Sequence, residues 1–380
     1  MKTVRRLIYR EALTAVAFVT LAFLALFFFF DFVDELQWLG KSITGKPEDS
    51  YQLVHILAYV VLVMPSHLYE LLPITVLIGT IFVMARLAQS SEYTILRTSG
   101  LGPARALKTL LILGLGFVFF TFAVGDYLAP ATDLQAQLLK SRYQGRITVG
   151  QTGAWLKEKQ RYGSYAVNVR ALASDGGMRG IRIYEFDANG LLVSQTQADH
   201  AHFGDGEFWL FDNASRAEFQ VPASAGAANA ALPAPRVERA LQNNYRWPTE
   251  ITAEMVSVAL LKPERMGTVD LFQYIQHLEV NGQATLRYEI EFWKKVFYPL
   301  SCLVMVVLAL PFAYLHFRSG NITNYVFAGV MIGISFFLLN NVFGYIGNLN
   351  NWLPWVAAGV PGLLYSIASL AAFGWLVLRR

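Results

Sequence analysis

The sequence predicts a membrane protein in which six transmembrane helices carry an inserted all-β domain of jelly-roll-like form. Of its 380 residues, 54% are apolar and only 15% are charged, whereas soluble domains usually carry about 25% charged residues. The apolar residues fall in long blocks, and the stretch between the third and fourth blocks alternates apolar with polar residues instead. The single cysteine, Cys302, excludes a disulfide framework and a cysteine-based metal cluster.

The first three spans precede the insert. Residues 12–33 form an uncharged run up to Asp31, which is long enough to cross a hydrocarbon core of roughly 30 Å. A basic N-terminus raises the alternative of a signal peptide, but the run is too long and no small-residue cleavage site follows, so we predict an uncleaved helix. The next apolar stretch contains Pro65 and Pro73, which favour a short helix at 53–64 and a span at 71–87. A third span covers 107–125.

Three further spans are predicted at 297–315, 324–346 and 353–378. Lys and Arg residues gather at four places that share one side if the six helices alternate, and these are Lys2, Arg5, Arg6 and Arg10, then Arg86, Arg97, Arg105 and Lys108, then Arg318, and finally Arg379 and Arg380. The positive side of a membrane protein is the cytoplasmic side. We therefore predict cytoplasmic termini, helices at 1–130 and 266–380, and an external insert at 131–265.

The insert is predicted to be a β domain. From Ile147 to Pro248 the residues alternate with period two, and Asn189-Gly190 is a strong hairpin signal between two such runs. Many short strands without a helical run indicate a sandwich or jelly roll, with a mobile loop at 221–235. An edge strand of this sheet is either protected or able to accept a partner's strand. Residues 268–283 predict an amphipathic helix that leads back to the membrane.

Motifs for chemistry are incomplete in this sequence. Gly40-Lys41-Ser42 ends like a phosphate-binding loop, but Glu35 stands where that loop needs its first glycine. His200 and His202 share one face of a predicted strand, which suits either a two-histidine metal grip or, more commonly, a solvated face, and spacing supplies no third ligand. No nucleophile–base pattern appears. We expect no catalytic residues and no metal, so any ATP chemistry belongs to another chain.

Polar residues and aromatic rings meet at the outer end of the first helix. Asp31 and Asp34 follow the aromatic run from Phe27 to Phe30, either as interface anchors or as the lining of a substrate mouth. Phe336 and Phe337 in the fifth span are either lipid-facing or the wall of an apolar cavity. The two interpretations stay open at this point.

The loop between the second and third spans predicts a short amphipathic helix at about 88–98. Ser90 or Ser91 can cap it, Glu92 suits the positive end of the helix dipole, and Ser99-Gly100 ends it. Such a helix either lies on the membrane surface or docks in a groove of a cytoplasmic partner and transmits force.

Four stretches in this order resemble the LptF/LptG family of lipopolysaccharide export permeases: DFVDEL (31–36), LAQSSEYTILRTSG (87–100), GDYLAP (125–130) and FWKKVFYPLSCLVMVVLALPF (292–312). The arrangement of three helices, a β insert and three helices is similar too, so the resemblance covers essentially the whole chain. The segment Trp293–Pro299 and the first-helix end that contains Asp34 favour the LptG branch over the LptF branch.

The resemblance implies an assembly of several chains in the bacterial inner membrane. It implies an LptF-like permease beside this chain, an LptB-like ATPase dimer that binds ATP and Mg²⁺, and an LptC-like bitopic protein that receives lipopolysaccharide from periplasmic β-jellyrolls. No nucleic acid is implied. The residues it marks for ATPase coupling are Glu92, Tyr93, Ile95, Leu96 and Arg97, and those it marks for substrate binding are Phe27, Phe30, Asp31, Asp34, Lys41, Lys140, Arg142, Phe336 and Phe337.

This sequence departs from the family at the outer end of the first helix. Some relatives carry lysines there, which suit the phosphates of lipid A, whereas this chain has Asp31, Gln37 and Trp38, and only Lys41 and Lys46 follow. The phosphate contacts are therefore expected to have moved, with Lys41 and Lys140 as the candidates.

The function expected from the sequence is the permease subunit of an ABC transporter that extracts lipopolysaccharide from the outer leaflet of the inner membrane and passes it to a periplasmic bridge. The alternatives are a permease for another lipid or for lipoproteins, and a membrane-anchored periplasmic scaffold. Six helices exceed what anchoring needs, which favours the transporters.

Overall fold

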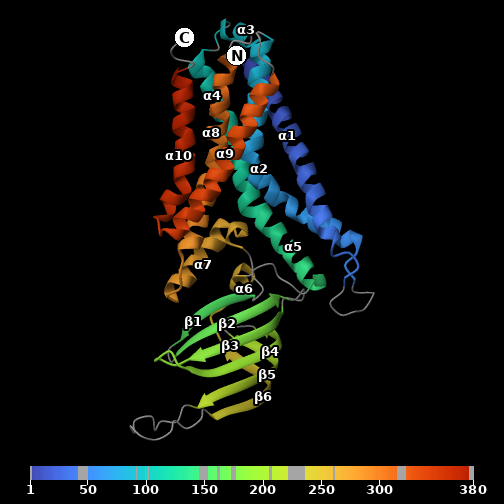
Figure 1. Cartoon of the computed structure of the whole chain (residues 1–380), viewed down its shortest axis with the longest axis vertical. Helices are drawn as coiled ribbons and strands as arrows, with labels where there is room; N and C mark the ends of the chain where they lie inside the picture. The colour runs from blue at the N-terminus through green and yellow to red at the C-terminus, as the bar shows by residue number, and fades with distance from the viewer. Residues whose placement is uncertain are drawn as a thin grey trace.

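The computed structural model describes residues 2–41, 50–90, 92–98, 100, 102–144, 153–160, 163–172, 177–204, 208–220, 236–259, 262–314 and 322–375. A helical bundle and a β-sheet follow one another along the long axis of the molecule (Figure 1). The helical elements are α1 Lys2–Leu36, α2 Leu53–Gln89, α3 Glu92–Thr98, α4 Pro103–Ala123, the π-helical turn η2 Val124–Leu128, α5 Ala129–Gln144, α6 Ala253–Ala259, the 3-10 turn η3 Pro263–Arg265, α7 Thr268–Val280, α8 Leu286–Ala309, the 3-10 turn η4 Leu310–Tyr314, α9 Ile322–Leu349 and α10 Pro354–Phe373.

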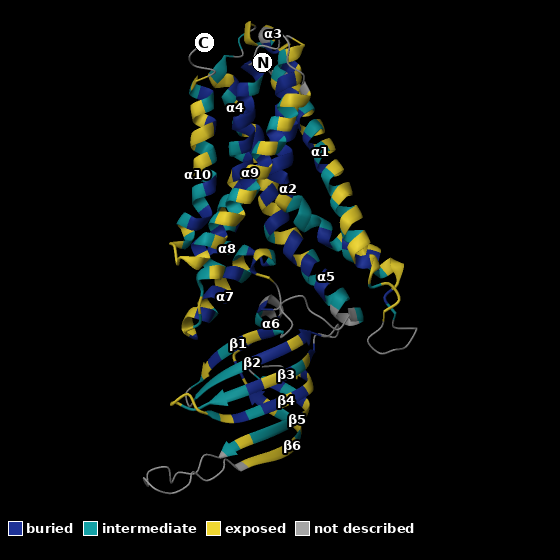
Figure 2. Ribbon diagram, viewed as in Figure 1, coloured by how far each residue is buried: buried dark blue, intermediate teal, exposed yellow. Residues whose placement is uncertain are grey.

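Six helical spans in the bundle are long and apolar enough to cross a membrane, as the sequence predicts. They differ in burial: 83% of the most apolar stretch of the span Leu53–Gln89 is buried, against 11% for Val4–Leu36 and 17% for Thr323–Leu349. Helix α2 is therefore the centre of the bundle, and α1 and α9 leave apolar side chains uncovered (Figure 2).

The predicted break in the second span is wrong. Helix α2 runs without interruption from Leu53 to Gln89, with Pro65 and Pro73 inside it. A proline removes one backbone hydrogen bond, but packing against neighbouring helices tolerates this loss within a membrane. Helix α2 contacts α1, α5, α8 and α9, so its surroundings are set by tertiary packing.

The third span is longer than the predicted 107–125. Helix α4 continues through η2 into α5, which ends at Gln144. Helix α5 thus occupies the start of the stretch 131–265 that the sequence assigns to the β domain. The sequence of α5 mixes polar with apolar residues along its length, so it contains no apolar run that would predict a continuing helix.

Helix α3, the start of α1 and the end of α10 lie at one end of the bundle, and the sheet lies beyond the other end (Figure 1). This arrangement agrees with an even number of crossings. Arg318, Arg379 and Arg380, which contribute to the predicted orientation, lie outside the described residues, as does the predicted loop 221–235.

The β domain is one antiparallel sheet of six strands whose neighbours follow chain order. The strands are β1 Ala154–Gln160, β2 Gly163–Leu172, β3 Met178–Phe186, β4 Leu192–Phe203, β5 Phe208–Gln220 and β6 Arg236–Pro248. This order is that of a meander, whereas a jelly roll joins two sheets by Greek-key connections. The described strands therefore support an antiparallel β domain, and the jelly-roll detail stays a prediction.

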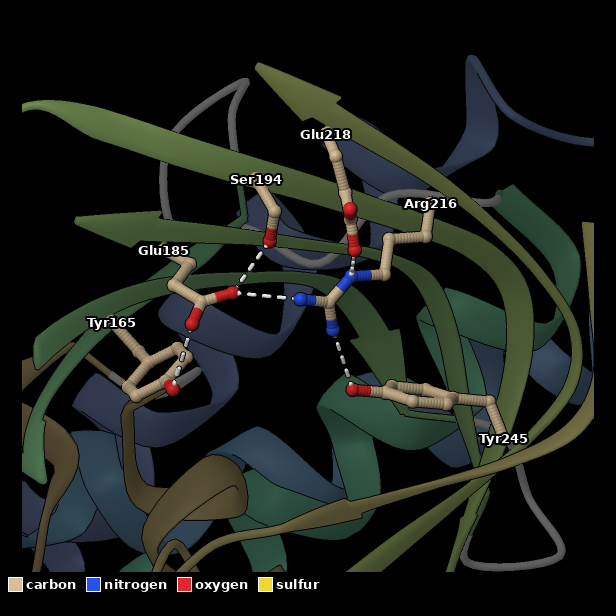
Figure 3. Close-up of polar contacts among 6 residues, drawn as sticks. All are labelled: Tyr165, Glu185, Ser194, Arg216, Glu218 and Tyr245. Atoms are coloured by element: carbon tan, nitrogen blue, oxygen red, sulfur yellow. Dashed lines mark hydrogen bonds and ion pairs between the residues drawn. The ribbon is translucent and has the colours of Figure 1, made fainter. Parts of the chain in front are cut away.

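The sheet curls until its two edges approach each other. The Gln160 side chain at the end of β1 donates a hydrogen bond to the Pro248 carbonyl at the end of β6, at 2.9 Å. The Tyr165 and Trp247 rings, from β2 and β6, meet edge to face at 5.7 Å. The curl makes one face of the sheet concave, and there Glu185 accepts hydrogen bonds from Tyr165, Ser194 and Arg216 (Figure 3).

The core of the domain lies on this concave face. Trp209, Phe211 and Val167 are buried there, and α6 and α7 cover them with Val256 and Leu271. The Trp209 indole donates to the Ile251 carbonyl at 2.9 Å, which satisfies its one polar group. The core continues towards the bundle along α5 and α8, so the sheet is attached to the spans by packing as well as by the chain.

The predicted amphipathic helix at 268–283 is α7, which ends at Val280. Directly after it, the Asn281 side chain accepts a hydrogen bond from the Lys159 backbone amide at 2.8 Å. This bond protects the edge of β1 at that point. On β4, His202 lies 3.7 Å from Asp212 with both side chains about half exposed, which fits a solvated strand face.

The burial of His277 on α7 predicts that the packing of this helix against the sheet depends on pH. Burial lowers its pKa below 6.5, although Glu158 and Glu250 oppose this shift. The unfolded chain therefore binds a proton before the folded chain does, so stability is complete above about pH 6.5 and falls as the pH drops towards the folded pKa. We expect the hydrogen-exchange protection factors of 268–283, corrected for the intrinsic exchange rate at each pH, to be lower at about pH 5.5 than at about pH 7.5.

The control for this dependence is a histidine on the exposed strand face. His277→Gln removes the titrating group and should flatten the pH dependence of the protection factors in α7, whereas His200→Gln should leave it as in the wild type. Equal protection of wild-type α7 at both pH values would show that His277 does not titrate across this range.

Candidate functional site

At the outer end of α1, Asp31 is paired with a side chain of α2. Its carboxylate lies 2.7 Å from His67 Nε2, and the His67 ring packs on the Phe27 ring with centroids 4.7 Å apart. The predicted site residues Phe27 and Asp31 are thus brought together through His67. Asp31 therefore contributes to the contact that holds α1 against α2.

One turn further along α1, Glu35 forms a buried ion pair with Lys140 of α5. The side chains are only 7% and 14% exposed. The Tyr51 hydroxyl lies 3.5 Å from the same carboxylate, and the Lys140 ammonium lies 4.5 Å from the centre of the Tyr59 ring. Burial raises the pKa of Tyr51, and the charge of Glu35 raises it further.

This ion pair changes the role expected for Lys140. The sequence suggests a free cation for a lipid phosphate, but in the structure Lys140 is paired with Glu35 and its ammonium lies against the Tyr59 ring. Lys140 can reach a phosphate only by leaving Glu35, and a buried carboxylate without its partner is costly.

The other basic and acidic candidates lie nearer to solvent. Lys41 is exposed, with its ammonium 4.4 Å from the centre of the Trp38 ring, and Asp34 is exposed as well. The side chain of Arg142 and the whole of Lys46 lie outside the described residues. Lys41 is therefore the described candidate that can meet an anionic group without first losing an ion pair.

The four phenylalanine candidates fall into two groups. Phe30 is 55% exposed on α1, and Phe27 is partly exposed beside His67. Phe336 of α9 is only 3% exposed, because it packs between the Tyr298 and Tyr365 rings. Phe337, next to it, lines a cavity of about 140 Å³ with Asn340 and Asn341. In this conformation Phe336 is part of the bundle core, whereas the other three offer surface to a ligand.

Helix α3 presents two different faces. Tyr93 is buried and Leu96 packs against the same cluster between α1, α2 and α4, whereas Glu92 is exposed and Ile95 is 62% exposed. Arg97 lies with its guanidinium 5.6 Å from the centre of the Tyr314 ring. Tyr93 and Leu96 therefore fasten the helix to the bundle, and Glu92 and Ile95 are left to meet another molecule.

Sequence reasoning missed the partners of the predicted residues. Glu35 and Lys140 are 105 positions apart, and Asp31 and His67 are 36 apart, so no local pattern connects them. Lys295 was missed as well, because the predicted span begins at 297, whereas the helical span in the structure begins at Leu286 and includes this lysine.

The model of one protein family matches residues 6–378 of the chain, and this family is described as "Lipopolysaccharide export system permease LptF/LptG". The chain belongs to the LptF/LptG family. Two curated relatives named "Lipopolysaccharide export system permease protein LptG" agree with this assignment. The protein from Escherichia coli (strain K12) is 26% identical over 352 residues, which cover 92% of this chain and 90% of the relative.

The second relative, from Haemophilus influenzae, is 24% identical over 386 aligned residues, which cover 100% of this chain and 99% of the relative. Both relatives carry the LptG name, which agrees with the LptG branch favoured by the sequence. As an LptF/LptG family chain, the molecule combines six apolar spans with an antiparallel β domain.

Proposed function

We propose that this chain is the transmembrane permease subunit of an ABC transporter that extracts lipopolysaccharide from the outer leaflet of the bacterial inner membrane. The observation that carries the proposal is the family match over nearly the whole chain. The geometry supports it, because an exposed helix for a cytoplasmic partner and a curled β-sheet lie at opposite ends of one bundle.

The exposed faces of the bundle support a second permease beside this one. Helices α1 and α9 carry large exposed apolar side chains, among them Phe18 at 74% and Phe327 at 65%. An LptF-like chain facing them would enclose a cavity between the two permeases, lined by Phe27, Phe30 and Phe337. An LptB-like ATPase dimer would dock on α3, and an LptC-like protein would receive the lipid.

The energetics of the substrate explain why such a cavity is needed. Each buried methylene stabilises a lipid in the membrane by about 0.8 kcal/mol, so extraction of several acyl chains through water is prohibitive. In an apolar protein cavity the acyl chains pass from the bilayer into another apolar environment, so the free-energy barrier to extraction stays low. The curled sheet beyond the end of the bundle opposite α3, periplasmic and jelly-roll-like in form, would continue this path.

This chain performs no chemistry in the proposal. ATP and Mg²⁺ are bound by the ATPase subunits, and the permease converts their closure into movement of α3 and of the helices attached to it. Both termini and α3 lie in the cytoplasm, as the distribution of Lys and Arg predicts.

The proposal is tested with the complex purified from cells that co-express this chain with its LptF-like, LptB-like and LptC-like partners. In proteoliposomes loaded with lipopolysaccharide, ATP should drive release of the lipid to the LptC-like protein. Mass spectrometry of lipid extracted from the complex should identify lipopolysaccharide. A different lipid would indicate another exporter, and a chain that purifies without an ATPase would indicate a scaffold.

A further inference from the structure

A π-helical turn divides the third membrane span. Residues Val124–Leu128 form this turn, with α-helix on both sides of it from Pro103 to Gln144. A π-turn contains one residue more than an α-turn and recurs at functional positions in helices. Gly125 lies inside the turn, and a Cβ there would overlap the Tyr69 ring of α2.

Lys295 of α8 holds this turn. Its ammonium donates a hydrogen bond to the Gly125 carbonyl at 3.0 Å and lies 5.5 Å from the centre of the Tyr69 ring. The residue is only 7% exposed. A lysine buried in a membrane span is costly, and here its charge is directed at a carbonyl that the π-turn displaces from the regular helical ladder.

On the α3 side of the turn, α4 and α8 are packed together as one pair. Gly114 lets the backbone of Leu303 approach closely, since a Cβ on Gly114 would lie 3.2 Å from the Leu303 Cα. Nearer the turn, the Thr121 hydroxyl lies 3.2 Å from the Cys302 sulfur. These contacts pack the two helices closely along this length, so in the proposal below they are treated as one unit.

The inner end of the pair is fastened to α3. Arg105 at the start of α4 donates to the Gly100 carbonyl at 2.8 Å, directly after α3. Tyr93 of α3 packs edge to face on Tyr314, which follows α8, with ring centroids 5.2 Å apart. A displacement of α3 is therefore transmitted to both helices of the pair.

The outer end of the pair meets the β domain at the π-turn. Asp126, inside the turn, accepts a hydrogen bond from the Thr268 backbone amide at 2.6 Å, at the start of α7. Beyond the turn, Leu134 and Leu138 of α5 pack against the core of the sheet. The turn thus lies where the membrane pair, the connector helix and the β domain join.

We propose that the π-turn at 124–128 is the joint through which movement of α3 reaches the β domain, with Lys295 as its positioning residue. The inference rests on the proposed function, in which α3 meets the ATPase. If the backbone hydrogen bonds of the turn shift from the π-helical to the α-helical register, the turn holds one residue fewer. Helix α5 then rotates against α4 by about 100°, the angle per residue of an α-helix. In the proposal the turn alternates between this π-helical state and an α-helical state, and such a two-state element can transmit movement between distant sites.

The test measures lipid release per ATP hydrolysed in the complete complex. Lys295→Met keeps the volume but removes the charge, and it should lower this ratio by about tenfold, within the usual range of coupling between sites. Lys295→Arg, which keeps a donor and the charge, should restore most of it. Arg287→Met removes a cation from an exposed ion pair at the start of the same helix and should leave the ratio unchanged.

A second measurement observes the joint directly. Spin labels are placed at Gln135→Cys of α5 and Asn348→Cys of α9, where both native side chains are exposed; the one native cysteine of this chain, Cys302, is buried, and exposed cysteines of the partner chains are replaced by serine. In the otherwise wild-type complex the distance should change between the nucleotide-free and the vanadate-trapped states. With Lys295→Met the two distances should coincide.

The outcomes separate the joint from the transporter. If the otherwise wild-type complex shows one distance in both states, or Lys295→Met couples as the wild type does, the joint is overturned. If the wild-type complex releases no lipid with ATP, the proposed function itself fails. If the complex with Lys295→Met does not assemble, two measurements still test the joint. These are the spin-label distances in the otherwise wild-type complex and the lipid released per ATP hydrolysed by the complex with Lys295→Arg.

Discussion

Replacing Glu92 by alanine is expected to weaken attachment of the ATPase or to uncouple its hydrolysis from transport. Glu92 is exposed in the first turn of α3, whereas Tyr93 next to it is buried in the bundle. Truncating one partner of a charge pair buried in an interface costs about 2–5 kcal/mol, and 2 kcal/mol corresponds to roughly 30-fold in affinity. Co-purification of the ATPase and lipid-dependent hydrolysis measure the two effects.

Thr98→Ala is the matched control for Glu92. Thr98 is exposed on the same short helix, and its hydroxyl bonds only to the Ile95 carbonyl in the described structure. This variant should retain the ATPase and its coupling. Wild-type yield and coupled hydrolysis in Glu92→Ala would remove this residue from the interface and leave α3 as a helix on the membrane surface.

Replacing Lys140 by alanine is expected to destabilise the outer end of the bundle by about 3–5 kcal/mol, because it leaves a buried carboxylate without its partner. Glu35 is 7% exposed and Lys140 is 14% exposed, so solvent screens this pair little. The loss should appear as a lower Tm of the detergent-solubilised complex.

The double variant Glu35→Gln and Lys140→Met distinguishes this structural role from lipid binding. It removes both charges, so it should recover most of the stability that Lys140→Ala loses. If Lys140 serves mainly a lipid phosphate, Lys140→Ala would retain the wild-type Tm and lose only lipid binding, and the double variant would not improve on it.

The membrane helices were predictable because their signal is local. A span needs about 20 consecutive apolar residues, and such runs stand out against the charged insert. Prediction failed where tertiary packing decides. Pro65 and Pro73 indicate a break in isolation, but α2 is the buried centre of the bundle and continues through both.

The sequence supplies candidate residue types but not their pairings. Aromatic rings beside Asp31 suit either a substrate mouth or an interface anchor at the end of α1, and Glu92 suits either a docking helix or a helix on the membrane surface. That Lys140 is neutralised by Glu35, and that Phe336 packs between tyrosines, follows from contacts between distant parts of the chain. The π-turn leaves no local signal, since Lys295 and Gly125 are 170 positions apart.

In the proposed transporter, α3 and the β domain face opposite sides of the inner membrane, α3 towards the ATPase and the β domain towards the lipid acceptor. Single cysteines at Ile95 of α3 and Leu241 of β6 test it, because both side chains are exposed and the native Cys302 is buried. In spheroplasts, a membrane-impermeant maleimide should label Leu241→Cys at once and Ile95→Cys only after the membrane is permeabilised. Labelling of Ile95→Cys in sealed spheroplasts, with Leu241→Cys protected, would contradict the account.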